Sequence, residues 1–243
     1  MAGRELPPSS PFAHDDGAAA PAVAAALAAL ADGSGSLGGV VGALAGTRVL
    51  VPVLAELEVA DLVVHGEHEH TVDKEASAGI VALQTPDGRR ALPVFSSVTS
   101  MAAWRADARP VPTDVARAAL SAVQEGWEVI VLDAGGPVPV LLPRPAVWAL
   151  AKQEPWSPAV HDGTVEPDVA AAVASALSTV GPVVRCAVEP GTRAELAVVV
   201  TLVGGLDRGS LENAVARINA ALAASEVVTE RVDSVELRLR RAS

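Results

Sequence analysis

Three histidines and two glutamates lie within six residues of one another, in the segment His65-Gly66-Glu67-His68-Glu69-His70. Imidazole and carboxylate groups are ligands of zinc and nickel, and His68 and His70 would share one face of an extended segment. The same residues also fit a solvated acidic loop between strands, because no neighbouring side chain is evident that would orient the imidazoles. We favour the loop, with weak adventitious metal binding. His65, His68 and His70 are therefore weak metal-ligand candidates, and no cofactor is predicted.

Asp133 is the best placed carboxylate for binding or for acid–base chemistry. It ends the apolar run Trp127–Asp133 and stands beside Gly135 and Gly136. Ligand sites in α/β sheets gather at the carboxyl ends of strands. An aspartate before a Gly-Gly-Pro turn also has a structural explanation. The other acidic pairs fall in polar segments, where we expect exposed carboxyls with ordinary pKa values: Asp15 with Asp16, and Asp73 with Glu75.

No catalytic motif is found in the sequence, which lacks G-x-S-x-G, the Walker A motif and H-E-x-x-H. We interpret Ser96, Ser97 and Ser100 as candidates for helix N-caps rather than nucleophiles. The segment Gly33–Gly38 matches G-x-G-x-x-G, but a helix is predicted before it, where a dinucleotide site needs a strand. A linker is therefore favoured there. The single cysteine, Cys186, lies in an apolar strand pattern that predicts a small buried side chain.

The four tryptophans and Phe95 all fall in the first part of the chain or just after it: Phe95, Trp104, Trp127, Trp148 and Trp156. Two interpretations stay open for them. They anchor the core of a domain that is otherwise rich in alanine, or some of them line a groove for a protein or peptide, since tryptophan is enriched at interaction hot spots. We favour the core.

Apolar periodicity predicts the elements that position these residues. Helices are expected at Pro21–Ala31, at Val40–Leu44, from Pro112-Thr113-Asp114 to Glu125, and at Ala146–Lys152, with a short helix carrying Trp104. Strands are expected at Arg48–Leu54, Ile80–Gln84, Arg89–Phe95, Trp127–Asp133 and Val138–Leu142. A tight turn at Thr85–Gly88 joins the second and third strands into a hairpin. The helix after Asp114 is expected to bury Val115, Ala119, Leu120 and Val123.

The segment Glu154–Pro158, with two prolines, predicts a domain boundary. Beyond it we expect a helix at Pro167–Thr179, strands at Val183–Val188 and Glu195–Val203, a helix at Ser210–Ala224 with Ser210 as its N-cap, and a strand at Ser234–Arg240. The chain is therefore predicted to be mixed α+β. A flexible N-terminal arm (1–20) precedes a five-stranded mixed-sheet domain with flanking helices (21–152), then a linker (153–165) and a smaller α-β-β-α-β domain (166–243).

The net charge of −11 argues against a nucleic-acid partner, because affinity for phosphates depends on clustered lysine and arginine. No apolar run is long enough to span a bilayer, and the N-terminal residues lack the basic and apolar regions of a signal peptide. We therefore expect a cytoplasmic protein with no membrane and no nucleic-acid partner. The oligomeric state is not predicted.

Several motifs follow one another between Arg48 and Ala151: the strand Arg48–Val53, the Asp87-Gly88 turn, the run Pro93–Ser97, Trp104, and the strand Val129–Leu132 followed by Asp133, Gly135 and Gly136. This order resembles the N-terminal domain of the SseB family, in its actinobacterial form. The residues after Pro158 are arranged like the C-terminal region of longer members. The resemblance implies a fold and a lineage and assigns no reaction.

We therefore expect a non-enzymatic protein that acts as an interaction or regulatory module. Its candidate binding residues are Phe95, Ser96, Ser97, Trp104, Asp133 and Gly135, which would face a protein partner together with the end of the hairpin. The alternative is a small-molecule-binding protein, or an enzyme of unrecognised type, with a pocket near Phe95 and Asp133.

Overall fold

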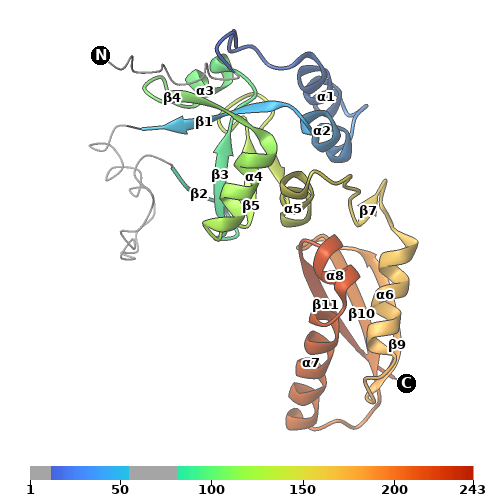
Figure 1. Ribbon diagram of the computed structural model, residues 1–243. Helices are drawn as coiled ribbons and strands as arrows, with labels where there is room; N and C mark the ends of the chain where they lie inside the picture. Colours follow the sequence, from blue (N-terminus) through green and yellow to red (C-terminus); the bar gives the residue numbers. More distant parts are fainter. Residues whose placement is uncertain (1–11, 55–80, 243) are drawn as a thin grey trace, which may run out of the picture. The chain divides into compact units, whose positions relative to one another are not determined.

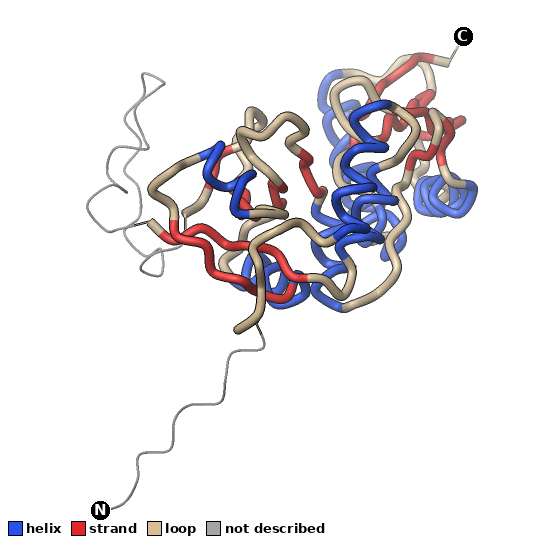
Figure 2. Tube along the Cα trace, turned by 90° about the horizontal axis from the view of Figure 1, so that it is seen from above, coloured by secondary structure: helices blue, strands red, loops and turns tan. Residues whose placement is uncertain are grey.

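The computed structural model describes residues 12–54 and 81–242. The chain divides into two compact units, the first ending at Pro155 and the second beginning at Trp156 (Figure 1). Helices and strands occur together in both units, as the colours of Figure 2 show. The predicted mixed α+β class is therefore confirmed.

The first unit holds five helices and six strands among its described residues. The helices are α1 (Pro21–Asp32), α2 (Leu37–Leu44), α3 (Val98–Trp104), α4 (Val115–Gln124) and α5 (Arg144–Lys152). The strands are β1 (Arg48–Val53), β2 (Leu83–Gln84), β3 (Arg90–Val94), β4 (Arg109–Asp114), β5 (Val129–Leu132) and β6 (Val140–Leu142). One sheet has the order β2-β3-β5-β6, in which only β3 and β5 run parallel. Strands β1 and β4 form a separate antiparallel pair, and a bridge between Leu50 and Phe95 joins this pair to the end of β3.

Strand β4 adds a sixth strand to the five that the sequence predicts. The residues Pro112-Thr113-Asp114 were expected to begin a helix, and this expectation is wrong, because they end β4 and the helix begins at Val115. Two prolines in the strand explain the miss, since proline lacks the amide hydrogen that a ladder uses. Proline is tolerated in a strand that pairs on one side only, and β4 pairs only with β1 among the described residues.

Helix α4 buries part of the predicted face, since Val115 and Ala119 are buried as expected. Its buried residues are Val115, Ala118, Ala119 and Ala122. Leu120, which was expected to be buried, is 46% exposed. The buried face of α4 is therefore made mostly of alanine. A hydrophobicity pattern ranks alanine low, but its small side chain lets the helix pack closely against the rest of the unit.

The predicted hairpin is present, although its first strand is only two residues long among the described residues. Leu83 pairs with Ala91 and Gln84 with Arg90. The turn is closed by the Gly88 amide, which donates to the Thr85 carbonyl at 2.8 Å, and Gly88 takes a φ of 87° that favours glycine. Ile80, where the first strand was expected to begin, lies outside the described residues.

The second unit is a three-stranded sheet covered on one face by helices. Its helices are α6 (Pro167–Leu177), α7 (Arg208–Ala223) and α8 (Glu226–Arg231). Its strands are β7 (Val160–His161), β8 (Thr164–Val165), β9 (Val183–Pro190), β10 (Leu196–Leu202) and β11 (Val235–Arg241). The sheet order is β11-β10-β9, with β11 parallel and β9 antiparallel to the central β10. All three helices lie on the same side of this sheet (Figure 1).

The core of the second unit lies between these helices and the sheet. Side chains from two helices and the central strand are almost completely buried in it: Val173 and Leu177 of α6, Ile218 of α7, and Val198 and Val200 of β10. Cys186 of β9 packs against the same core and is half-buried.

Helix α7 begins earlier than expected, and the predicted cap Ser210 is wrong. The N-cap is Asp207, whose carboxylate accepts a hydrogen bond from the Ser210 amide at 2.7 Å. Ser210 therefore takes part in the cap through its backbone. Aspartate and serine are about equally good N-caps, so composition alone did not distinguish the two positions.

Candidate functional site

The carboxyl ends of β3 and β5 lie side by side, because these two strands run parallel with Val94 opposite Leu132. The residues that follow them therefore leave the sheet at the same edge. There the Asp133 carboxylate accepts two hydrogen bonds from Ser96, one from the amide at 2.8 Å and one from the hydroxyl at 2.7 Å. Both residues are buried, with exposed fractions of 5% and 4%. Asp133 thus holds the chain as it leaves β3.

Asp133 also forms the turn that leads to β6. Its φ of 54° lies in the left-handed region, which aspartate tolerates better than most residues. The Gly136 amide donates to the Asp133 carbonyl at 3.0 Å and closes the turn. Both the backbone and the side chain of Asp133 therefore serve the fold, which agrees with the structural explanation that the sequence left open.

Helix α3 follows directly on this junction. The Ser97 hydroxyl accepts a hydrogen bond from the Ser100 amide at 3.0 Å, so Ser97 is the N-cap that the sequence proposed. At the other end of α3, the Trp104 ring packs on the Phe95 ring with 5.3 Å between centroids. Gly135 lies against the Trp104 backbone, where an added Cβ would be 3.2 Å from the Trp104 Cα.

The structure therefore brings all six candidate binding residues to one end of the first unit, in two sets. Phe95, Ser96 and Asp133 are buried and form the support. Ser97 and Trp104 are half-buried and Gly135 is exposed, so these three have surface that a partner could contact. Whether any of the six binds a partner stays a prediction.

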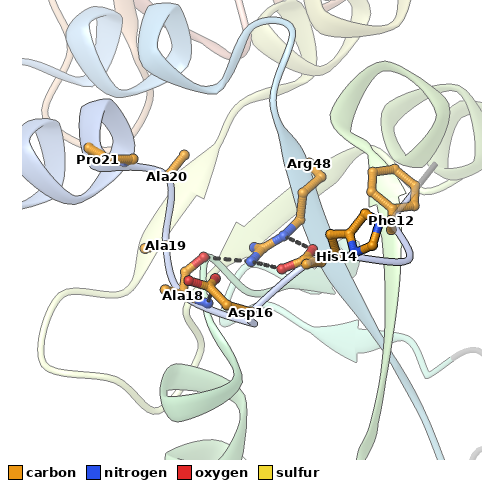
Figure 3. A pocket seen from close by; sticks show the side chains of 9 residues that line it. Phe12, His14, Asp16, Ala18, Ala19, Ala20, Pro21 and Arg48 are labelled. Carbon is orange, nitrogen blue, oxygen red and sulfur yellow. Dashed lines mark hydrogen bonds and ion pairs between the residues drawn. The ribbon is translucent and has the colours of Figure 1, made fainter.

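Sequence reasoning missed Arg48, which connects this junction to the N-terminal segment. Its Nη1 donates to the Ser96 carbonyl at 2.6 Å. Its Nε and Nη2 donate to the two carboxylate oxygens of Asp15 at 2.5 and 2.8 Å, and Nη2 also donates to the Ala18 carbonyl at 2.5 Å. Figure 3 shows Arg48 reaching from β1 toward the segment that contains Ala18. Arg48 is thus fully engaged by partners that lie far away in the sequence.

The expectation that Asp15 is exposed with an ordinary pKa is wrong. Its side chain is only 13% exposed in the pair with Arg48. The hydrogen bond from Arg48, together with one from the Gly17 amide, holds the pKa of the Asp15 carboxyl below its ordinary value, although burial acts in the opposite direction. The Gly17 carbonyl in turn accepts from the Val98 amide at 2.9 Å, so residues 15–18 are bound to both β1 and α3.

An open hollow of about 510 Å³ lies beside this contact. Arg48 and residues of the N-terminal segment line it, with Phe12 and Pro21 as apolar walls and His14 and Asp16 as exposed polar groups (Figure 3). Arg48, which lines the hollow, also contacts the Phe95–Asp133 junction through its hydrogen bond to the Ser96 carbonyl. Neither Phe95 nor Asp133 lines this hollow, so the pocket expected near these two residues stays a prediction.

Other candidate motifs contribute no site to the described structure. His65, His68, His70, Asp73 and Glu75 lie outside the described residues, so their metal-binding role stays a prediction. Within residues 12–54 and 81–242, no group of three or more His, Cys, Asp or Glu side chains could hold a metal ion. The glycine-rich segment after α1 is a helix–helix connection, in which Gly33 ends α1 at a φ of 79° and Ser36 caps α2.

The tryptophans divide between core and surface. Trp127 is buried, Trp104 and Trp156 are half-buried, and Trp148 on α5 is 43% exposed. The core interpretation thus describes Trp127 best, while Trp148 leaves room for the alternative.

A family model described as the SseB protein N-terminal domain matches residues 23–149, a span that contains β1 to β6 and every candidate binding residue. No curated protein and no solved structure matches the chain. Among the described residues, no helix has the length and apolar character needed to cross a membrane.

Proposed function

The chain belongs to the SseB family, and on that premise we propose that it is a cytoplasmic protein-interaction or regulatory module rather than an enzyme. The observation that carries this proposal is the Asp133–Ser96 pair. The best placed carboxylate of the site accepts two hydrogen bonds from Ser96, and the Ser96 hydroxyl donates to that carboxylate. Both residues are buried, so neither the carboxylate nor the hydroxyl is open to a substrate. The actinobacterial type and the likeness of the second unit to longer members stay predictions.

The proposed contact surface is helix α3 with the two residues beside it, Ser97 and Gly135; we call it the α3 surface. Its outward positions include Val98, which is 41% exposed, and the small exposed residues Ala102 and Ala103. Trp104 adds an aromatic edge, a side chain enriched at interaction hot spots. Because α3 is capped by Ser97 and rests on Phe95, the α3 surface is held in one conformation, which lowers the entropy cost of binding.

The experiment that tests the α3 surface compares two alanines that are exposed on helices of the same unit. Ala102→Arg places a long charged side chain on α3, and Ala25→Arg makes the same change on α1. We expect a quantitative pull-down from native lysate to recover a partner with wild type and Ala25→Arg, and to lose it with Ala102→Arg. Recovery of no specific partner, or equal recovery with both variants, would contradict the proposal.

The alternative function is that of a small-molecule-binding protein or an enzyme of unrecognised type. The hollow beside Arg48 favours it, because its volume of about 510 Å³ is that of a small-ligand site. It predicts that a metabolite raises the melting temperature of the protein and that His14→Ala, which changes an exposed lining residue, abolishes this shift. His161→Ala in the second unit is the matched control. A broad metabolite screen without any shift would contradict this alternative.

A further inference from the structure

The face of the second unit's sheet that points away from α6, α7 and α8 carries its charges in three rows. Side chains alternate between the two faces of a strand, so Ala197, Val199 and Thr201 of β10 point away from the core that Val198 and Val200 enter. Residues opposite one another in paired strands share a face. The rows are therefore Glu189-Ala197-Glu236, Ala187-Val199-Arg238 and Arg185-Thr201-Arg240.

The charged groups of the first two rows, two glutamates and one arginine, are paired with one another, and Arg193 lies 3.4 Å from the Glu236 carboxylate as a second cation. Arg238 donates through Nη2 to Glu236 at 2.5 Å and to the Thr192 hydroxyl at 3.1 Å, and its Nη1 lies 3.6 Å from the Glu189 carboxylate. Glu236 also accepts from the Thr192 amide at 2.7 Å. Arg238 thus contacts both glutamates of this face, and Thr192 adds a backbone hydrogen bond to Glu236.

The third row, which we call the Thr201 row, keeps an excess of positive charge. Arg185 and Arg240 are both exposed, and the guanidinium group of neither has a hydrogen bond or an ion pair with any residue that the structure describes. Neighbouring strands lie about 5 Å apart, so their Cα atoms are separated by about 10 Å with Thr201 between them. Two unpaired guanidinium groups therefore flank the half-buried Thr201 at one end of this sheet face, in a protein whose net charge is −11.

We propose that the Thr201 row binds an acidic, extended segment of a partner protein. Each guanidinium can engage a carboxylate through two parallel hydrogen bonds, and the hydroxyl of Thr201 can donate to either. Carboxylates two positions apart on an extended peptide lie on one face about 7 Å from each other, a spacing that two arginine side chains at the two ends of one row reach. The ligand is thus a segment with acidic residues at alternate positions.

A peptide fits this row better than a nucleic acid does. A phosphate backbone needs a long track of positive charge, whereas only two arginines are unpaired here. The proposal concerns the second unit and is independent of the α3 surface proposed above.

The test uses the full chain and a fluorescein-labelled peptide with glutamate at alternate positions, followed by fluorescence anisotropy at low ionic strength. Arg185→Gln/Arg240→Gln is compared with Arg208→Gln/Arg217→Gln, which removes the same charge from exposed positions of α7. We expect wild type and the α7 control to bind alike, and the double variant of the Thr201 row to bind about tenfold more weakly. Added salt should weaken wild-type binding, because exposed charges are screened.

Three outcomes overturn the proposal. The first is that the peptide binds both double variants equally, which would mean that only net charge matters. The second is that a peptide with glutamine in place of glutamate binds wild type as tightly as the acidic peptide does. The third is that a single-stranded oligonucleotide binds wild type more tightly than the acidic peptide does. Far-UV circular dichroism and denaturant unfolding are the controls that check whether both double variants are folded. The α3 surface test has a different readout, so the two proposals fail separately.

Discussion

The contacts around Arg48 in the first unit and the outer sheet face of the second unit are both built from arginine and carboxylate side chains, but the two regions differ in how many of these groups are paired. Arg48 is engaged on all three of its nitrogens, by Asp15, Ala18 and Ser96, and the nearby Asp133 is satisfied by Ser96. On the outer sheet face, Arg238 is engaged in the same way, but Arg185 and Arg240 on the next row are not. We call the first set, Asp15, Arg48, Ser96 and Asp133, the closed set, because its charged groups are paired within the protein. The outer sheet face keeps two arginines whose charge is not paired.

This difference separates residues that hold a fold from residues that are free to bind. Buried polar groups must find partners within the protein, because an unpaired one costs free energy. Exposed arginines carry no such demand, since water solvates them. A buried carboxylate at a strand end is therefore weaker evidence for a binding site than an exposed arginine that the fold leaves without a partner.

The largest effect that tests the closed set is expected from Asp133→Ala. The change leaves the buried Ser96 amide and hydroxyl without their acceptor and places alanine at a φ of 54°. We expect the free energy of unfolding of the first unit to fall by about 3 kcal/mol, from the unpaired donor and the backbone strain together. Urea denaturation measures it.

Asp133→Asn is the matched control, because asparagine tolerates the left-handed region and keeps one acceptor oxygen. It should lose less than half as much stability. A loss below about 0.5 kcal/mol for Asp133→Ala, the size of an ordinary surface change, would show that the set is not closed around Asp133.

A smaller effect is expected from Gly135→Ala, compared with Gly126→Ala. Both glycines have a φ near 70°, 74° for Gly135 and 70° for Gly126, so alanine is strained at both by about 1 kcal/mol. At Gly135 the new Cβ would also lie 3.2 Å from the Trp104 Cα, whereas at Gly126 it would meet nothing within 4 Å. Gly135→Ala should therefore be the more destabilising change in thermal unfolding. Equal losses would mean that α3 moves freely relative to the Asp133 turn.

The sequence could predict the parts of this site that depend on local pattern. Local pattern places the ends of β3 and β5 within one residue of where they lie, at Val94 and Leu132, and it also gives the turn at Gly88 and the cap at Ser97. It could not predict that β3 and β5 pair in parallel, which is what brings Ser96 to Asp133 across 37 positions. Pairing of strands that are distant in sequence depends on the whole fold and leaves no local signal.

The same limit explains the errors. Asp15 and Arg48 are 33 positions apart, and an aspartate in a polar segment gives no indication of its partner. Strand β4 was missed because its prolines oppose a strand assignment that only its pairing with β1 permits. The rows of the outer sheet face depend on the register of three strands, so the surplus at Arg185 and Arg240 is visible only in the structure.

Asp15→Asn tests whether the N-terminal segment belongs to the closed set. It removes an ion pair that is mostly buried, and we expect a loss of about 1 kcal/mol, the upper end for pairs near a surface. The pKa of Asp15 is lower in the folded protein than its ordinary value of 3.8, so the contribution is present above that pH and is lost as the pH falls through the folded-state pKa. Wild type and Asp15→Asn should therefore differ in urea denaturation at neutral pH and converge in acid. A constant difference across this range would exclude the ion pair as the cause.

The smallest expected effect is that of Glu236→Gln, which tests whether the charged groups in the first two rows of the outer sheet face are paired with one another. The amide of Thr192 and the guanidinium of Arg238 lower the pKa of Glu236 from 4.5 to about 2. Because the folded-state pKa is the lower one, the carboxylate stabilises the fold above pH 4.5, and this contribution disappears as the pH falls toward 2. Hydrogen exchange of the β10 and β11 amides should be faster in Glu236→Gln than in wild type at neutral pH, and the two should become alike in acid. The variant also releases Arg238 beside the Thr201 row, so the acidic peptide should bind it more tightly than wild type. Weaker binding would mean that Glu236 positions the arginines of the Thr201 row rather than competing for them, and the separation between paired and unpaired charge on this face would then be wrong.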